Sequence, residues 1–174
     1  DLGDAGSILF ESFEMKCELS SSASLIHWKA EVDHAECLSN GGTLEIYQDS
    51  SGRKNWQSRN HGNASGRIPC RFRGYELRSA ARTETGHHAS PTVAIEGGDG
   101  SVAVAIPEFW QQFPGSVSAN TSQIGIGLFP SQWDDLFELQ GGEQKTQTVW
   151  LSLGQEDVDL HEFDWVHKPI RVTA

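Results

Sequence analysis

The chain of 174 residues carries thirteen Lys and Arg against twenty-four Asp and Glu, and its net charge is −11. That charge argues against nucleic acids and anionic membranes as partners, because both are bound through a basic surface. No apolar stretch approaches the roughly 18 residues of a membrane-spanning helix. Three cysteines without a C-x-x-C spacing indicate neither a disulfide framework nor a zinc site. The length fits one domain with its own hydrophobic core.

The first predicted strands lie in the first third of the chain. Residues 25–33 (LIHWKAEVD) alternate apolar and polar side chains, which places Ile26 on one face and His27 and Lys29 on the other. Such alternation is typical of an antiparallel strand with one buried face. Residues 43–48 (TLEIYQ) repeat the pattern after a glycine turn. We expect both segments to be half-buried strands.

The clearest hairpin lies in 92–106, where TVAI and VAVAI flank the turn EGGDGS. The glycines of this turn supply the positive-φ positions that a tight hairpin requires. In the second strand, Val102 and Val104 alternate with Ala103 and Ala105, so both of its faces are apolar. We therefore expect this strand to lie inside a sheet that is covered on both sides.

Two glycines share one face of the next predicted strand, 123–128 (QIGIGL). Ile124 and Ile126 point to one side of it, and Gly125 and Gly127 point to the other. Glycines repeated on one face leave room for the close approach of another sheet, a neighbouring domain or a flat ligand.

The remaining elements are less regular. Residues 144–153 (QKTQTVWLSL) alternate as a strand, and 163–173 (FDWVHKPIRVT) predict an edge strand interrupted by a proline. One short helix is expected at 107–113 (PEFWQQF), where a proline suits the first turn. Together the elements predict an all-β fold, a jelly-roll-like antiparallel β-sandwich with at most one or two short helices. We expect residues 1–174 to form this single domain.

The most unusual segment is 50–73 (SSGRKNWQSRNHGNASGRIPCRFR), which has no strand periodicity. In an acidic chain it concentrates Arg, Lys, Asn and His around one Trp. Planar donors suit the hydroxyls and carboxylates of sugars, and an indole suits the C–H face of a pyranose ring. The alternative is a surface loop held by its own hydrogen bonds, with its indole in the core. The candidate ligand-binding residues of this segment are Trp56, Arg59, Asn60, His61 and Arg67.

A second candidate segment is 82–91 (RTETGHHASP). Arg82, His87 and His88 suit acid–base chemistry or the neutralisation of a carboxylate, and we treat all three as candidate ligand contacts. If these adjacent histidines lie on a strand they point to opposite faces, so the pair predicts no joint metal site, whereas a turn at Gly86 would relax that constraint. The alternative for each histidine is a structural role.

A third candidate segment is 129–145 (FPSQWDDLFELQGGEQK). Trp133 is a candidate platform for a sugar ring, and Asp134 and Asp135 are candidate ligands of a structural calcium ion. The spacing of these carboxylates is not that of an EF-hand, so solvated charges in a turn are the alternative reading. No motif in the chain requires a cofactor.

Five motifs, taken together and in their order along the chain, resemble one known family. The motifs are SSGRKNWQSRNH (50–61), FRGYELR (72–78), TGHHASPTVAI (85–95), FWQQFPGSV (109–117) and LFPSQWDDLFELQGGEQKTQTVWLSLG (128–154). Over residues 40–154 the chain is similar in these motifs to the central domain of the exo-rhamnogalacturonan lyase and YetA-like family. The His87-His88 pair departs from the family pattern, which has a Gly-Arg or Gly-Leu-Arg run there.

In that family a barrel-like domain precedes a β-sandwich, and a large α/α toroid follows it. The resemblance therefore implies that this chain is the middle piece of a larger, secreted or periplasmic polysaccharide lyase. The chain opens on DLGD, with neither an initiator Met nor a basic signal segment, as expected of a mature or excised segment. A β-eliminating lyase must neutralise a uronate carboxylate and shuttle protons, and for such a reaction the candidates are Arg82 and His88.

Three functions remain open on this basis. The first is a carbohydrate-binding domain that recognises an acidic polysaccharide, with the flanking catalytic domains of the parent enzyme as further partners. The second is a part of the catalytic unit of the lyase, and the third is a purely structural module between domains. For the isolated domain we expect binding rather than catalysis.

Overall fold

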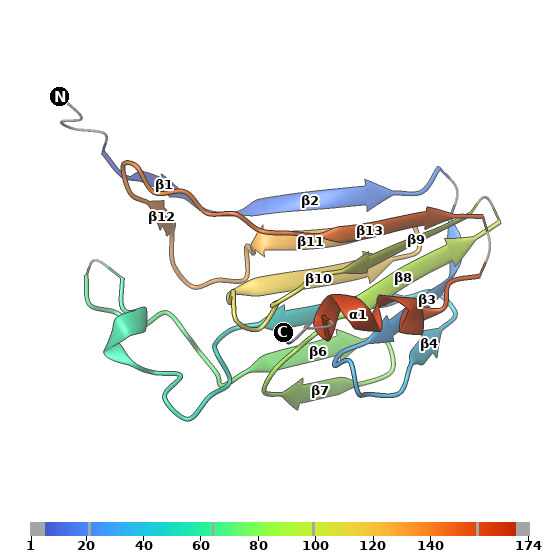
Figure 1. Ribbon diagram of the computed structural model, residues 1–174, viewed down its shortest axis with the longest axis horizontal. Coiled ribbons are helices and arrows are strands. Elements are labelled where there is room, and N and C mark those ends of the chain that lie inside the picture. Colours follow the sequence, from blue (N-terminus) through green and yellow to red (C-terminus); the bar gives the residue numbers. More distant parts are fainter. Residues whose placement is uncertain (1–5, 21, 64, 99, 156, 170–174) are drawn as a thin grey trace, which may run out of the picture.

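The computed structural model describes residues 6–20, 22–63, 65–98, 100–155 and 157–169, and over these residues the chain forms two antiparallel sheets that face each other (Figure 1). The predicted all-β antiparallel sandwich is confirmed. One sheet consists of β2 (Phe13–Glu18), β11 (Gln123–Phe129), β10 (Gly115–Asn120), β5 (Thr43–Gln48), β6 (Tyr75–Ser79) and β7 (Thr83–Gly86), in that spatial order. The other consists of β13 (Trp150–Gly154), β9 (Gly100–Ala105), β8 (Thr92–Gly97), β3 (Ala23–Lys29) and β4 (Cys37–Ser39).

A short two-stranded ribbon, β1 (Ile8–Phe10) with β12 (Phe137–Leu139), projects from one end of the sandwich (Figure 1). Helical structure in the described residues is limited to the 3₁₀ turns η1 (Arg59–His61) and η2 (Leu160–Phe163) and to the single-turn helix α1 (Asp164–His167). No helix of the described residues has the length and apolar character needed to cross a membrane.

The main core lies between the two large sheets and follows the predicted alternation. Ile46 of β5, Ile124 and Ile126 of β11, and Val93 of β8 are fully buried in one cluster. Gly125 and Gly127 lie on the opposite, outward side of β11, as predicted from their spacing. The hairpin of β8 and β9 is confirmed, with Thr92 paired to Ala105 and Gly97 to Gly100.

A second, smaller core covers the outer face of the five-stranded sheet. Leu160, Phe163 and Val166 of η2 and α1 pack on Ala94, Ala103 and Ala105. The predicted edge strand over 163–173 is therefore wrong for residues 163–167, and its residues 170–173 lie outside the described residues. Apolar residues recur here every three positions, at Leu160, Phe163 and Val166. This helical spacing places their side chains on one face of the helical turns, and that face is buried.

This cover also changes the environment of β3. The prediction that His27 and Lys29 face solvent is wrong, since both side chains are buried. Lys29 Nζ bonds the Asp164 carboxylate at 2.6 Å, and His27 Nδ1 lies 2.7 Å from a Glu36 carboxylate oxygen. Burial of a charged group requires a partner of this kind. The strand ends at Lys29 and not at residue 33.

Two further predicted elements differ from the structure. Residues 107–113 form successive turns instead of a helix, because Glu108 adopts a φ of 53°, outside the right-handed helical region. The strand predicted over 144–153 is confined to Trp150–Gly154. All three cysteines are free thiols, and burial raises the pKa of Cys70 to about 11.

Candidate functional site

The long connections of the sandwich converge at one end, which we call the loop end and define by residues 49–74, 86–91, 106–114 and 130–136. The register places these connections together, because Gln48, at the end of β5, pairs with Gly115 at the start of β10 and with Tyr75 at the start of β6. Figure 1 shows the teal-to-green loop of residues 50–70 projecting from this end, below the β1–β12 ribbon. The first and third candidate segments of the sequence therefore share one end of the molecule.

The base of the 50–73 loop is held by buried polar groups at the end of β5. The Asp49 carboxylate is fully buried and accepts hydrogen bonds from Arg71 N (2.6 Å), Phe72 N (3.0 Å) and the Tyr47 hydroxyl (2.9 Å). Burial raises the pKa of Tyr47, and the neighbouring Asp49 raises it further, so this hydroxyl acts as a donor. Gln48 Nε2 donates to the backbone oxygen of Ser50 at 2.6 Å. The loop therefore starts and ends on a rigid clamp.

The charge of this loop contrasts with that of the rest of the chain. Segment 50–73 contains no Asp or Glu, although the whole chain has a net charge of −11. Lys54 and Arg59 are exposed and form no ion pair within the described residues. Arg53 lies over the Trp110 ring, 5.0 Å from its centroid. The basic residues of the segment are Arg53, Lys54, Arg59, Arg67, Arg71 and Arg73.

The loop and the segment 130–136 are joined by one cation and two carboxylates. Arg67 Nη1 lies 2.9 Å from Asp134 Oδ2, and Arg67 Nη2 lies 3.4 Å from Asp135 Oδ2. The Asn63 amide also donates to Asp135. Burial acts to raise the pKa of Asp135, but the hydrogen bonds from Asn63 and Leu136 N, with the charge of Arg67, hold it below its ordinary value. Both carboxylates are thus engaged by protein donors.

The same contacts occupy Asp134 and Asp135, which the sequence suggested as ligands of a calcium ion. Their oxygens bond Arg67 and Asn63, and the described residues contain no group of three or more His, Cys, Asp and Glu side chains arranged to hold a metal. In this structure Asp134 and Asp135 connect the segment 130–136 to the 50–73 loop.

Trp133 stands between two hollows of the loop end. One hollow, of about 390 Å³, is lined by His61, Asn63, Asp135 and the Trp133 ring. The other, of about 440 Å³, is lined by the same ring with Arg67 and Asp134. The indole is only partly buried and is backed by Phe137, with ring centroids 6.2 Å apart and an angle of 18° between the planes. A flat apolar ring with carboxylate and amide groups beside it can hold one face of a sugar ring and bond its hydroxyls.

Three other predicted residues lie on the same loop. Trp56 is half-buried, whereas Arg59 and Asn60 are exposed on η1. The Ser58 hydroxyl caps this turn by accepting from Asn60 N. His61 lies edge-on to Phe113, with centroids 5.2 Å apart. Of the predicted residues of the first segment, His61 and Arg67 thus lie beside the third segment. Neither hollow at Trp133 is lined by Trp56, Arg59 or Asn60.

The histidines of the second segment have different surroundings. The His88 ring stacks on Trp110, with centroids 4.2 Å apart, on the ring that also carries Arg53. Burial lowers the pKa of His88, and the nearby His87 and Arg53 lower it further, so the ring is neutral near pH 7. His88 therefore has a packing role in this structure, between the loop and the core.

His87 lines a separate cavity of about 580 Å³ at the edge of the sandwich, which we call the edge cavity. Glu31, Glu84 and Arg73 also line it, and Tyr75 forms its floor. The Tyr75 hydroxyl donates to Glu31 at 3.0 Å. Burial raises the pKa of Tyr75, and the neighbouring Glu31 raises it further. The edge cavity therefore brings titratable groups together at a place separate from the hollows at Trp133.

Arg82 lies at the opposite end of the sandwich from the loop end. It follows β6 and precedes β7, and its side chain pairs with Glu84 at 2.9 Å and reaches Cys37. The structure does not bring Arg82 and His88 together, because the two residues lie at opposite ends of β7.

The sequence places Asn63 among the amide donors of the 50–73 loop, but its role in forming a turn was missed. Its Oδ1 accepts from Ser65 N and Arg67 N, which fixes the turn that presents Arg67 to the carboxylates. The motif Asn-Ala-Ser-Gly is a turn signal of this type and could have identified it. Glu45 and Arg78, which line a hollow on the outward face of β5 and β6, were also missed, because they are ordinary polar positions of alternating strands.

No family model, curated protein or solved structure matches the chain at a significant level.

Proposed function

We propose that the loop end binds an acidic polysaccharide and that the chain is a carbohydrate-binding domain. One observation carries the proposal: an acid-free segment with six basic residues adjoins the hollows on both sides of Trp133, in a chain whose net charge is −11. A uronate chain offers carboxylates to the basic residues and pyranose faces to the indole.

The charge distribution favours this ligand over other polyanions. Lys54 and Arg59 are unpaired within the described residues, so their charges are available to a ligand, whereas Arg67 is committed to Asp134. Two free cations on the same loop as His61, which lines a hollow at Trp133, suit a polymer with one carboxylate per sugar. A nucleic acid, with a charge on every nucleotide, requires a broader basic surface than this acidic chain has.

The proposed context is a polysaccharide lyase that acts outside the cytoplasm. The motif resemblance over residues 40–154 supports this context, and in it the domain holds the polymer for flanking catalytic domains. The loop end would then increase the local concentration of substrate at the catalytic domains.

Affinity electrophoresis in gels that contain polygalacturonate or alginate tests the proposal. We expect retardation of the wild-type chain and its loss in Trp133→Ala, because the platform is removed. Trp165→Ala is the matched control, since Trp165 is a half-exposed indole on α1, outside the loop end. Equal retardation of both variants would contradict binding at Trp133.

A second candidate function, β-elimination, is favoured by the edge cavity. Tyr75, His87 and Arg73 line one hollow, and a lyase needs groups of these types to shuttle protons and neutralise a carboxylate. Unsaturated uronate absorbs in the ultraviolet, so an increase in absorbance on incubation with polygalacturonate tests for this activity. Loss of the signal in His87→Ala would assign it to the edge cavity.

A further inference from the structure

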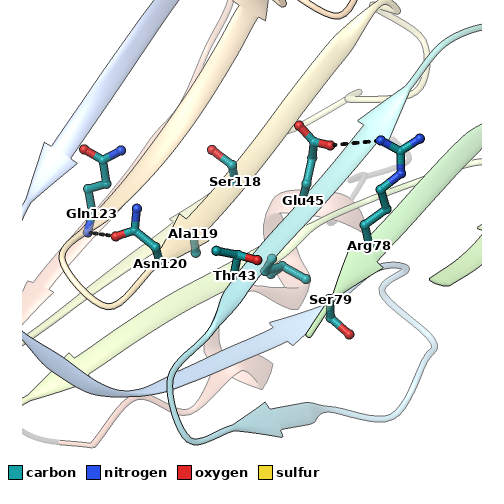
Figure 2. Close-up of a pocket in the computed structure, with 9 residues that line it drawn as sticks. Thr43, Glu45, Arg78, Ser79, Ser118, Ala119, Asn120 and Gln123 are labelled. Carbon is teal, nitrogen blue, oxygen red and sulfur yellow. Dashed lines mark hydrogen bonds and ion pairs between the residues drawn. The ribbon is translucent and has the colours of Figure 1, made fainter. Parts of the chain in front are cut away.

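The outward face of the six-stranded sheet carries a hollow that the sequence did not identify, which we call the sheet trough. Helical segments cover the outer face of the other sheet, whereas β5, β6, β10 and β11 present theirs openly, and Figure 2 shows the side chains that stand on it. The register places Gly125, Ser118, Glu45 and Arg78 side by side across four strands. The trough crosses these strands toward the end of the sheet that is opposite the loop end, where Thr43, Ser79 and Asn120 lie.

Small residues lie in the trough and beside it. Gly125, which pairs with Ser118 beside the hollow, has no side chain, and a Cβ placed there would lie 2.6 Å from the Ser118 hydroxyl. Glu45 and Arg78 form one wall, with Glu45 Oε2 and Arg78 Nη1 3.9 Å apart (Figure 2). The resulting hollow has a volume of about 360 Å³, within the range of small-ligand pockets. Its remaining lining is Thr43, Leu44, Ser79, Ala119, Asn120 and Gln123.

The trough extends toward the loop end. A second hollow of about 150 Å³ shares Glu45 and Arg78 with it and adds Tyr47, Phe72 and Gln132. The Gln132 amide donates to Glu45, while its Oε1 is buried and accepts no hydrogen bond within the described residues. Gln132 directly precedes Trp133, so the trough meets the loop end at this residue.

The chemistry of the trough differs from that of the loop end. Arg78 is neutralised, since it bonds Glu76 and faces Glu45, so the trough offers no free cation to a carboxylate. What it offers is hydroxyls, amides and one balanced ion pair. Groups of this kind donate to and accept from sugar hydroxyls. The trough thus suits neutral, hydroxyl-rich sugar units.

We propose that the sheet trough is a second glycan subsite, which binds a neutral segment of a polysaccharide along the strands. The inference rests on the proposed function in that the same polymer continues to Trp133. Small residues at the centre admit the ring, and the long side chains of Glu45, Arg78 and Gln132 bond its hydroxyls. Binding at this subsite does not depend on charge, so salt leaves it unchanged.

Affinity electrophoresis with neutral polysaccharides tests this subsite. The probes are galactomannan, arabinogalactan, xyloglucan and dextran, in gels with and without about 1 M NaCl, where the Debye length falls to about 3 Å. We expect retardation by at least one probe, equal at both salt concentrations. Gly125→Leu should abolish it, because Gly125 pairs with Ser118 of the lining and the added side chain displaces the Ser118 hydroxyl, which lies 2.6 Å from a Cβ built at Gly125. The φ of Gly125 is one that leucine can adopt.

Gly98→Leu is the matched control, since a Cβ at this exposed hairpin glycine meets nothing within 4 Å. Ser118→Gln is the second trough variant, at a position that already carries a Cβ, and circular dichroism melting verifies that each variant is folded. Retardation that survives in both trough variants, or no retardation by any neutral probe, overturns the subsite. Polygalacturonate retardation that is lost in Trp133→Ala but kept in Gly125→Leu separates the two proposals.

Discussion

The two large sheets have outer faces that are built alike but covered differently. On the five-stranded sheet, Ala94 and Ala103 form a shallow floor, and η2 and α1 lie on it. On the six-stranded sheet, Ser118 and Gly125 form a comparable floor, and no helix of the described residues lies on it. In both cases small residues allow something to approach closely.

The difference lies in the polarity of the two floors. Alanine methyl groups offer apolar surface, and Leu160 removes that surface from water. Serine hydroxyls, with Glu45 and Arg78 beside them, gain nothing from an apolar cover. One face is therefore completed by the chain itself, while the other is suited to a polar ligand. The predictions below test this contrast.

The largest expected effect is on the covered face. Leu160→Ala removes a fully buried side chain and should lower the free energy of unfolding by roughly 2–4 kcal/mol. Urea denaturation measures this change. Leu153→Ala is the control, because Leu153 is 77% exposed and its truncation should change stability by less than about 0.5 kcal/mol. Equal effects would mean that η2 does not pack as described.

The ion pair beneath α1 should respond asymmetrically to substitution. Asp164→Asn leaves the buried Lys29 ammonium without its counter-ion and should cost roughly 3 kcal/mol of unfolding free energy. Lys29→Met leaves only Asp164, which is 38% exposed and can be hydrated, and should cost less. The same urea titration compares the two. A larger loss for Lys29→Met would contradict the burial of Lys29.

The covered face should also weaken in acid. Burial lowers the pKa of His167 to about 4, from an ordinary value near 6.5. Between these values the unfolded chain binds the proton and the folded chain does not, so stability present above pH 6.5 is lost as the pH falls toward 4. The expected loss is roughly 1–2 kcal/mol after allowance for the solvent-accessible part of the ring.

Unfolding midpoints measured at pH 7 and pH 5 in the wild type and in His167→Gln give this difference. Glutamine stays neutral and can still bond Thr92, whose hydroxyl lies 3.0 Å from His167 Nε2. The acid-induced loss should shrink in the variant. Below pH 4, burial of Asp164 tends to raise its pKa but the bonds from Lys29 and His161 outweigh it, so its contribution is lost at still lower pH.

The smallest expected effect is on an exposed charge of the loop end. Arg59→Gln should weaken retention by polygalacturonate roughly twofold to fivefold, because a single exposed ionic contact contributes little. It should also reduce the dependence of retention on salt. Arg82→Gln, at the other end of the sandwich, should change neither quantity. A loss with Arg82→Gln equal to that with Arg59→Gln would argue against a localised site.

Much of the sandwich could be predicted from local patterns. The strands at 43–48 and 92–106 follow from alternation and glycine turns, because alternation assigns each side chain to one face of a strand. Residues 163–167 were misread as part of an edge strand, since the helical spacing of the apolar residues repeats over too few positions to outweigh Pro169, which indicated an edge strand. Whether a polar residue such as Lys29 is buried depends on that distant segment, and no local pattern contains this information.

The candidate site could be predicted only in part. The cationic loop and Trp133 were recognisable by composition, but the contact of Arg67 with Asp134 joins residues 67 positions apart. The sheet trough depends on the register of four strands, which brings Glu45 beside Ser118 and Arg78. Pairing between strands is a property of the whole fold, so these neighbours could not be read from their own segments.

Amide chemical-shift mapping with a galacturonate oligosaccharide tests the central claim most directly. We expect concentration-dependent shifts in the loop end, centred on Trp133 and on residues 53–67, and none at Arg82. Shifts confined to another face of the sandwich would contradict it. So would the absence of any shift with oligosaccharides of galacturonate, glucuronate, mannuronate and guluronate.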